Sequence, residues 1–142
     1  MFRLCPWADY LYAMDRAWWK VYKEEAEKKF SGAMYSPCQG IKGVINGKFP
    51  ASGNSGAGGI NLARYLGASE IFLLGYDAAY DGNKRHCHAD HPKPLGNAGS
   101  VENWNKHFLS ISKLIGIPVL NCSRKTAVTA FKRADLEEVL NA

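Results

Sequence analysis

Long apolar stretches are missing from this sequence. No run reaches the about 18 consecutive apolar residues that a membrane-spanning helix needs. Residues 1–7 are interrupted by an arginine and a proline, so they lack the continuous apolar stretch of a secretory signal. The sequence therefore predicts a cytoplasmic protein that makes no membrane contact.

Paired cysteines are missing as well. The four cysteines, Cys5, Cys38, Cys87 and Cys122, stand singly, with no C-x-x-C pair and no dense framework. Small secreted domains that depend on disulfides have many closely spaced cysteines. We therefore expect reduced thiols, in agreement with a cytoplasmic location.

The sequence also lacks the modules that bind nucleic acids. It has no glycine-aromatic RNA motif, no zinc-finger spacing and no sustained basic stripe. The formal net charge is +5, but part of the positive charge is balanced within residues 23–29. There, Glu24 and Lys28, like Glu25 and Lys29, have the i,i+4 spacing typical of a solvated helix face. We therefore expect no direct binding of nucleic acid.

The composition that is present is that of one folded domain. The chain has 142 residues, of which 46% are hydrophobic and 22% are charged. A chain of this length buries roughly two-thirds of its unfolded surface. No repeat and no low-complexity linker divides it, so the sequence predicts a single domain over residues 1–142.

The N-terminal part predicts a strand followed by a helix. Residues 9–14 form an apolar and aromatic run, typical of a buried strand, and Asp15 follows as a candidate helix cap. An amphipathic helix over 16–30 comes next, ended by a Ser-Gly pair. Apolar residues recur at every fourth position of this helix: Trp18, Tyr22, Ala26 and Phe30.

The rest of the chain alternates short strands with helices. The predicted elements are extended segments near 33–36 and 41–45, a helix at 60–66 ended by Gly67, a strand at 70–76, a polar loop at 78–100, a helix at 101–115, a strand at 117–120, and one or two short helices within 126–131 and 135–140. This alternation, without hairpin signals, predicts an α/β fold with a mostly parallel sheet flanked by helices. We expect the strand at 70–76 to be central. The predicted core contains Leu11, Tyr12, Trp18, Ile60, Leu66, Ile71, Leu73, Leu74, Val119 and Leu120.

Polar residues follow the predicted strands. Three groups of polar residues come directly after a predicted apolar strand: Asp15, the segment from Asp77 to Tyr80, and the segment 121–123 (Asn-Cys-Ser). Ligands of parallel sheets bind beyond the carboxyl ends of the strands. These residues are therefore candidates for a binding site, and the alternative is that they only cap helices and form turns.

A glycine-rich segment at 51–59 runs into the predicted helix at 60–66. Glycines let backbone N–H groups approach a phosphate, and a helix N-terminus favours negative charge. An anion site here would be lined by Asn54, Ser55, Gly56 and Gly58. Neither the third glycine of the dinucleotide fingerprint nor a P-loop lysine is present. The alternative is that the glycines serve close packing of the helix on the sheet.

The loop at 78–100 contains the run His-Cys-His-Ala-Asp-His at 86–91. This run matches the H-x-H-x-D-H pattern of metallo-β-lactamase-like hydrolases, but we reject that family because no strand precedes the run and the downstream ligands are missing. A simpler zinc site, from His86, His88, Asp90 and His91, stays an alternative, as does a purely polar loop. We favour proton transfer by a loop histidine, since no second cluster would complete a zinc shell.

Several of these segments together resemble a known family. The stretch from Gly53 to Asp77, with the following Asp-Gly at 81–82, resembles phage-encoded, norphogenetic-type proteins, a family of uncharacterised function. Residues 6–15 with the Trp pair at 18–19, and the loop at 88–97, are similar to parts of the same family. The sequence resembles more distantly the Rossmann-like core of bacterial sialyltransferases and of motility-accessory and pterin-diphosphokinase-like proteins.

The resemblance implies a nucleotide site and a catalytic base. It implies that Asn54, Ser55 and Gly56 hold a cytidine nucleotide sugar, with Asn121, Cys122 and Ser123 around it, and that His88 or His91 is the base. Tyr80 is the one tyrosine near the place where the transferases hold the leaving phosphate, and the acceptor would lie near Asp77. Both families begin with a strand and a G-x-G-P-S turn. This sequence starts beyond that turn, so we expect a Rossmann-like domain that lacks its first strand and is truncated at its N-terminus.

These observations lead to one functional hypothesis and one alternative. The hypothesis is a phage or prophage protein of the host cytoplasm that binds a nucleotide or nucleotide sugar and acts as a glycosyltransferase-like enzyme with a loop histidine as base. Its nucleotide site would use Asp15, Gly58 and the residues that the resemblance implies. The alternative is a binding module without catalysis, whose open sheet edge takes a second copy or a partner protein.

Overall fold

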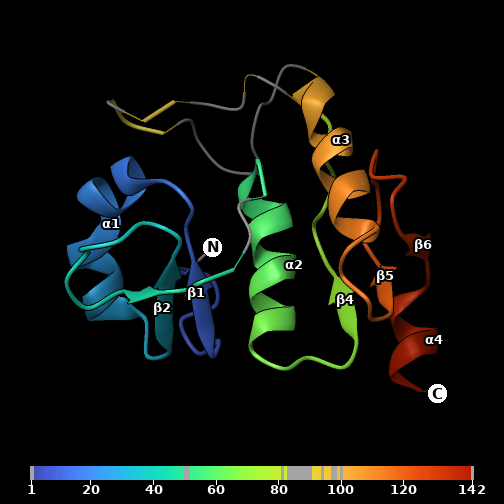
Figure 1. Cartoon of the computed structure of the whole chain (residues 1–142), viewed down its shortest axis with the longest axis horizontal. Helices are drawn as coiled ribbons and strands as arrows, with labels where there is room; N and C mark the ends of the chain where they lie inside the picture. The colour runs from blue at the N-terminus through green and yellow to red at the C-terminus, as the bar shows by residue number, and fades with distance from the viewer. Residues whose placement is uncertain are drawn as a thin grey trace. The chain divides into compact units, whose positions relative to one another are not determined.

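The computed structural model describes residues 2–49, 52–80, 82, 91–93, 95, 96, 99 and 101–141. The chain divides into two compact units, Met1–Ala51 and Ser52–Ala142 (Figure 1). Each unit has one small, entirely parallel three-stranded sheet, with α1 (Arg16–Lys29) beside the first sheet and α2 (Ser55–Tyr65), α3 (Val101–Ser112) and α4 (Leu136–Leu140) in the second unit. The mixed α/β class that the sequence predicts is therefore confirmed for the described residues.

The first unit is a strand-helix-strand crossover with a third strand added. Its elements are β1 (Tyr10–Tyr12), α1 (Arg16–Lys29), β2 (Ala33–Ser36) and β3 (Ile45–Asn46). The strand order is β1-β2-β3, with Leu11 opposite Met34 in the register. A helix between two parallel strands is the ordinary way to return the chain to the same end of a sheet.

The core of the first unit lies between its sheet and α1. Trp19, Ala26 and Phe30 of the helix segment are buried together with Leu11 and Ala13. The sequence periodicity predicts Trp18 as the core tryptophan, but the more deeply buried ring is Trp19, which is 2% exposed. Its indole Nε1 donates to the carbonyl oxygen of Ala13 at 3.0 Å, so this polar atom is satisfied inside the core.

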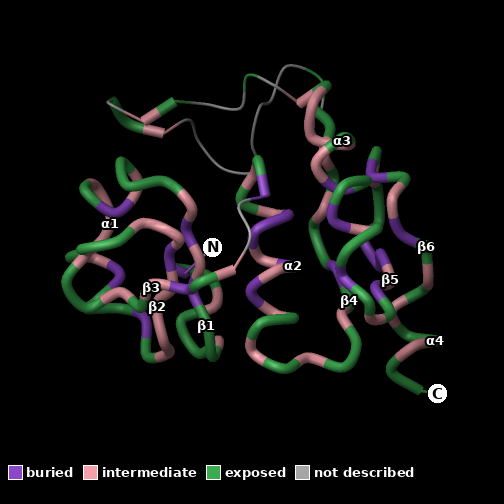
Figure 2. The backbone as a smooth tube through the Cα atoms, viewed as in Figure 1, coloured by how far each residue is buried: buried purple, intermediate pink, exposed green. Residues whose placement is uncertain are grey.

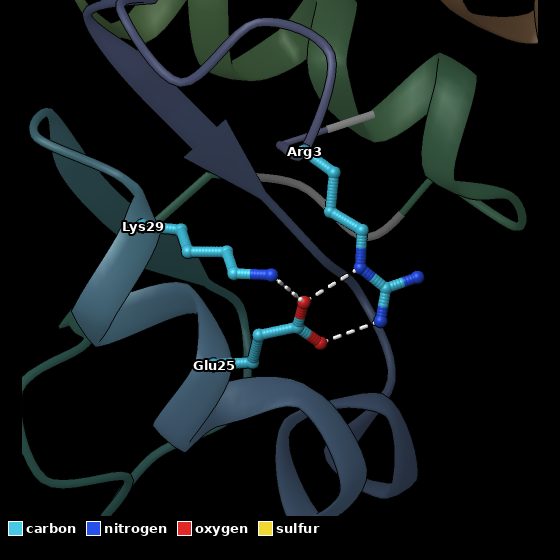
Figure 3. A network of polar contacts seen from close by, with 3 residues as sticks. All are labelled: Arg3, Glu25 and Lys29. Atoms are coloured by element: carbon cyan, nitrogen blue, oxygen red, sulfur yellow. Dashed lines mark hydrogen bonds and ion pairs between the residues drawn. The ribbon is translucent and has the colours of Figure 1, made fainter.

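The N-terminal residues are attached to the outer face of α1 by an ion-pair network (Figure 3). Arg3 donates through Nε and an Nη to the two carboxylate oxygens of Glu25, at 2.7 and 2.5 Å, and Lys29 donates to the same carboxylate at 2.8 Å. The hydrogen bonds from Arg3, and then from Lys29, lower the pKa of Glu25 to about 2. The same bond to Glu25 raises the pKa of Arg3.

The second unit is also built on a crossover. Its elements are α2 (Ser55–Tyr65), β4 (Ile71–Leu73), α3 (Val101–Ser112), β5 (Val119–Asn121), β6 (Lys132–Arg133) and α4 (Leu136–Leu140). The strand order is β4-β5-β6, and the register places Leu73 opposite Asn121. The helices α2 and α3 pack against each other.

The core of the second unit joins these two helices to the sheet. Figure 2 marks the buried residues of the chain in purple. The predicted core residues Ile60, Leu73 and Val119 are buried. Leu74 is a wrong prediction, since its side chain is 56% exposed. The prediction that the strand at 70–76 is central is also wrong within this sheet, because β5 lies in the middle and β4 at one edge.

Three element boundaries differ from the sequence expectations. The helix α2 begins at Ser55, inside the glycine-rich segment, and ends before Gly67, whose φ of +96° stops it as predicted. Residues 126–131 contain no helix, and the short strand β6 follows them. Within the described ranges, no helix combines the length and the apolar character needed to cross a membrane.

Candidate functional site

The candidate site lies in the second unit, where β4 and β5 end beside the start of α2. Parallel strands present their carboxyl ends at the same edge of the sheet. The main-chain N–H of Tyr76, after β4, donates to the hydroxyl of Ser123, after β5, at 2.8 Å. The hydroxyl of Tyr76 donates to the carbonyl oxygen of Gly56 in α2 at 3.1 Å. Tyr76 therefore connects all three segments.

The first turn of α2 presents unused backbone donors. Asn54 is the N-cap, and its Oδ1 accepts the N–H of Ala57 at 2.8 Å. The N–H of Gly58 donates to the carbonyl oxygen of Asn54 at 3.0 Å. The N–H groups of Ser55 and Gly56 have no acceptor among the described residues, and Ser55 is exposed. Two amides at the positive end of the helix are thus available to an anion.

The glycines of this turn also serve packing. A Cβ on Gly56 would lie 3.1 Å from the Tyr76 ring and 3.2 Å from Phe108, and a Cβ on Gly59 would lie 3.4 Å from the Tyr76 hydroxyl. The packing alternative therefore accounts for Gly56, whereas the distance at Gly59 is an ordinary van der Waals contact. Gly53 is different, because its φ of +76° is a left-handed conformation that glycine adopts without strain.

The pKa of the Tyr76 hydroxyl is strongly shifted from its ordinary value. Its ring packs on Phe108, with 5.9 Å between the ring centroids, and its hydroxyl faces the backbone of α2. Burial raises the pKa of Tyr76 to about 12, because a phenolate would lose its hydration there. The hydroxyl stays protonated at neutral pH and acts as a donor.

The polar residues after β5 bond to one another. Asn121 is completely buried; its Oδ1 accepts the N–H of Ser123 at 3.0 Å, and its Nδ2 donates to the hydroxyl of Thr126 at 3.1 Å. The Thr126 hydroxyl in turn donates to the carbonyl oxygen of Tyr76 at 2.6 Å. Asn121 and Ser123 therefore hold the shape of the loop after β5, and their contact with a nucleotide stays a prediction.

A pair of cationic side chains follows β5, and the sequence-based prediction of the site does not include it. Arg124 and Lys125 directly follow Ser123 and are exposed. Arg133 holds this turn by donating to the carbonyl oxygens of Ser123 and Arg124, at 2.6 and 3.2 Å. Neither Arg124 nor Lys125 forms an ion pair with a described residue. The sequence contains a signal for this pair, since it follows the polar segment 121–123 after the predicted strand at 117–120.

The sequence does not place His107 in the predicted site either. It lies in α3, and its Nδ1 is 3.3 Å from Nδ2 of Asn54. Its ring covers Gly53 so closely that a Cβ there would lie 2.5 Å from the ring. No local sequence pattern joins His107 to Asn54, which is 53 residues earlier, so only the fold shows this pair.

One buried hydroxyl at the start of this unit is unsatisfied. Ser52, two residues before the N-cap of α2, is 7% exposed, and its Oγ has no hydrogen-bond partner in the described part of the chain. A buried polar atom without a partner costs free energy unless water or a ligand satisfies it.

The remaining predicted site residues lie in different parts of the chain. Asp77 and Tyr80 are exposed after β4, where Ala78 has a φ of +47°. Asp15 belongs to the first unit; it precedes α1 and is exposed, but its carboxylate forms no cap bond. His91 is half-buried. His86, His88 and Asp90 lie outside the described residues, and within the described ranges no three His, Cys, Asp or Glu side chains cluster as a metal site.

No family model, curated protein or solved structure matches the chain in comparisons with known proteins. The family resemblance given above therefore stays a prediction.

Proposed function

We propose that this protein binds a phosphate-bearing ligand, a nucleotide or nucleotide sugar, at the start of α2 and the carboxyl ends of β4 and β5. The observation that carries the proposal is the pair of free amides, on Ser55 and Gly56, at an exposed helix start that also borders two parallel strands. Backbone N–H groups in this position bind phosphate groups without any positively charged side chain.

Charge at the same edge supports an anionic ligand. Arg124 and Lys125 follow β5 without acidic partners among the described residues. The chain between Asn103 and Ala134 contains no Asp or Glu at all. An arginine and a lysine after β5, in the same unit as the free amides, favour a ligand with more than one negative charge, such as a nucleoside diphosphate.

The strand connectivity supports a Rossmann-like fold, which we propose as the finer description of the α/β class. Rossmann sheets consist of two parallel halves with the overall order 3-2-1-4-5-6. Each of the two separate sheets, with the orders β1-β2-β3 and β4-β5-β6, has three parallel strands, as one such half does by itself. Each half has its first crossover through one helix, α1 or α3. Such halves bind mononucleotides in many proteins.

Binding without catalysis is a second candidate. The side chains of Asn121, Ser123 and Thr126 use their polar atoms to bond to the protein itself. They are therefore occupied in shaping the site. Glycosyl transfer would need a base, for which His88 and His91 are the proposed residues.

Calorimetric titration with CMP, CDP, UDP and inorganic phosphate tests the proposal. We expect saturable binding of at least one nucleotide. The double variant Arg124→Gln/Lys125→Gln should weaken the binding of a diphosphate by about tenfold, since two exposed charged contacts contribute up to about 1 kcal/mol each and about 1.4 kcal/mol corresponds to a factor of ten.

Lys113→Gln is the matched control. Lys113 follows α3, the helix that returns the chain to the amino ends of the strands, so it lies away from the site. Its replacement removes a positive charge and should leave the affinity unchanged. Absence of binding by all four compounds at millimolar concentration would contradict the proposed function.

A further inference from the structure

The hydrogen-bonding roles of Asn54 and His107 follow from which of their side-chain atoms can donate and which can accept. Asn54 Oδ1 accepts the N–H of Ala57 at 2.8 Å, and in an amide only the oxygen can accept. The amide nitrogen Nδ2 must therefore face His107, whose Nδ1 lies 3.3 Å away. The N-cap fixes the orientation of this amide.

The tautomer of His107 follows from the same argument. An amide nitrogen can only donate, so Nδ1 of His107 must present its lone pair to Asn54. A neutral imidazole with a free Nδ1 has its proton on Nε2. If Nδ1 carried the proton, two donors would face each other, and Asn54 could restore a bond only by giving up its cap on Ala57.

Gly53 provides the space for this arrangement. A Cβ at Gly53 would lie 2.5 Å from Cδ2 and 2.6 Å from Nε2 of His107, closer than any real contact. The ring occupies the volume that a side chain at position 53 would fill. The left-handed backbone of Gly53, the cap of Asn54 and the ring of His107 thus form one interlocked unit.

We propose that His107 is a positioning residue of the anion site. In its Nε2-protonated form it holds the Asn54 amide in the orientation that caps α2 and leaves the Ser55 and Gly56 amides free for a phosphate group. The effect on the ligand rests on the proposed function, whereas the tautomer and the cap do not depend on any ligand.

Nuclear magnetic resonance of the ¹⁵N-labelled protein tests the first part directly. In the neutral ring of His107 we expect a protonated Nε2 and an unprotonated Nδ1, a signature that a merely space-filling ring would not require. A neutral ring with its proton on Nδ1 would overturn the proposal.

Two substitutions distinguish a hydrogen-bonding role of His107 from a role that only fills space. His107→Leu removes the acceptor, and hydrogen exchange of the Ala57 amide should accelerate about two- to tenfold, as expected for a weakened N-cap. His107→Asn places a carbonyl oxygen near the position of Nδ1 and should restore slow exchange. Equal exchange in the wild type and in His107→Leu, measured on folded protein, would overturn the proposal.

The affinity for inorganic phosphate completes the test. It should fall in His107→Leu and recover in His107→Asn. If the wild-type protein binds neither phosphate nor a nucleotide while the tautomer and the exchange rates are as expected, the proposed function is contradicted and the role of His107 in the cap is confirmed.

Discussion

At the scale of single residues, burial raises one pKa and ion pairing lowers another. The pKa of Tyr76 is raised to about 12 and that of Glu25 is lowered to about 2, for opposite reasons. Tyr76 loses hydration, which disfavours its charged form. Glu25 gains two cationic partners, which favour its charged form. Each shift implies a dependence of stability on pH.

Tyr76 should make the protein less stable at alkaline pH. Its pKa is raised from 10 to about 12, so in this interval the unfolded chain releases a proton that the folded protein retains. Stability is therefore lost as pH rises, at up to about 1.4 kcal/mol per pH unit. Urea unfolding of Tyr76→Phe across this interval should lack the extra loss. An identical pH dependence in both proteins would contradict the burial of this hydroxyl.

Glu25 should change the stability of the protein at acidic pH. Its pKa falls from 4.5 to about 2, so the unfolded chain binds a proton before the folded protein does. The contribution of Glu25 to stability is present above pH 4.5 and is lost as pH falls toward about 2. Glu25→Gln should flatten the acid unfolding curve without changing the alkaline one. Acid curves that coincide would show that the contacts of Figure 3 do not form in solution.

At the scale of elements, the sequence predicts the positions of most helices and strands but not all of their ends. The start of α2 was missed because glycine is a poor helix former, and the segment 55–59 contains three glycines. There, tertiary packing on Tyr76 and Phe108 outweighs propensity. The strand β6 consists of Lys132 and Arg133, which carry no apolar signal, so only pairing with β5 shows it.

The exposure of Leu74 has a local cause. The strand β4 ends at Leu73, and Gly75 then adopts a φ of +71°, so the chain leaves the sheet at this point. The apolar run at 71–74 suggested a strand buried on both faces throughout, and periodicity could not show where pairing ends.

Leucines 73 and 74 offer a matched test of this boundary. Leu73→Ala should lower the free energy of unfolding by about 2–5 kcal/mol, because Leu73 is 2% exposed in the core. Leu74→Ala should change it by less than about 0.5 kcal/mol, as is usual for exposed positions. Equal losses in the two variants, measured by chemical denaturation, would show that the register of β4 is wrong.

At the scale of the whole molecule, the sequence predicts the class of fold and part of the site. The α/β class follows from alternating strands and helices, and the proposal of an anion-binding turn follows from glycines before a helix. The contribution of His107 could not be predicted, because it depends on α3 packing against α2. The roles of Asn121 and Ser123 in shaping the loop likewise depend on Tyr76 and Thr126, which periodicity does not connect to them.

The central claim is that the backbone amides at the start of α2 bind a phosphate group, and a proline tests it most directly. Ser55 is the first residue of the helix, where proline fits well, and the extended backbone of Asn54 suits a residue before proline. Ser55→Pro therefore removes one amide donor while the helix remains, and Ser55→Ala keeps that donor. We expect calorimetric titration with the tightest-binding nucleotide to show an affinity about tenfold weaker for Ser55→Pro and unchanged for Ser55→Ala. Equal affinities of the two folded variants would contradict the account.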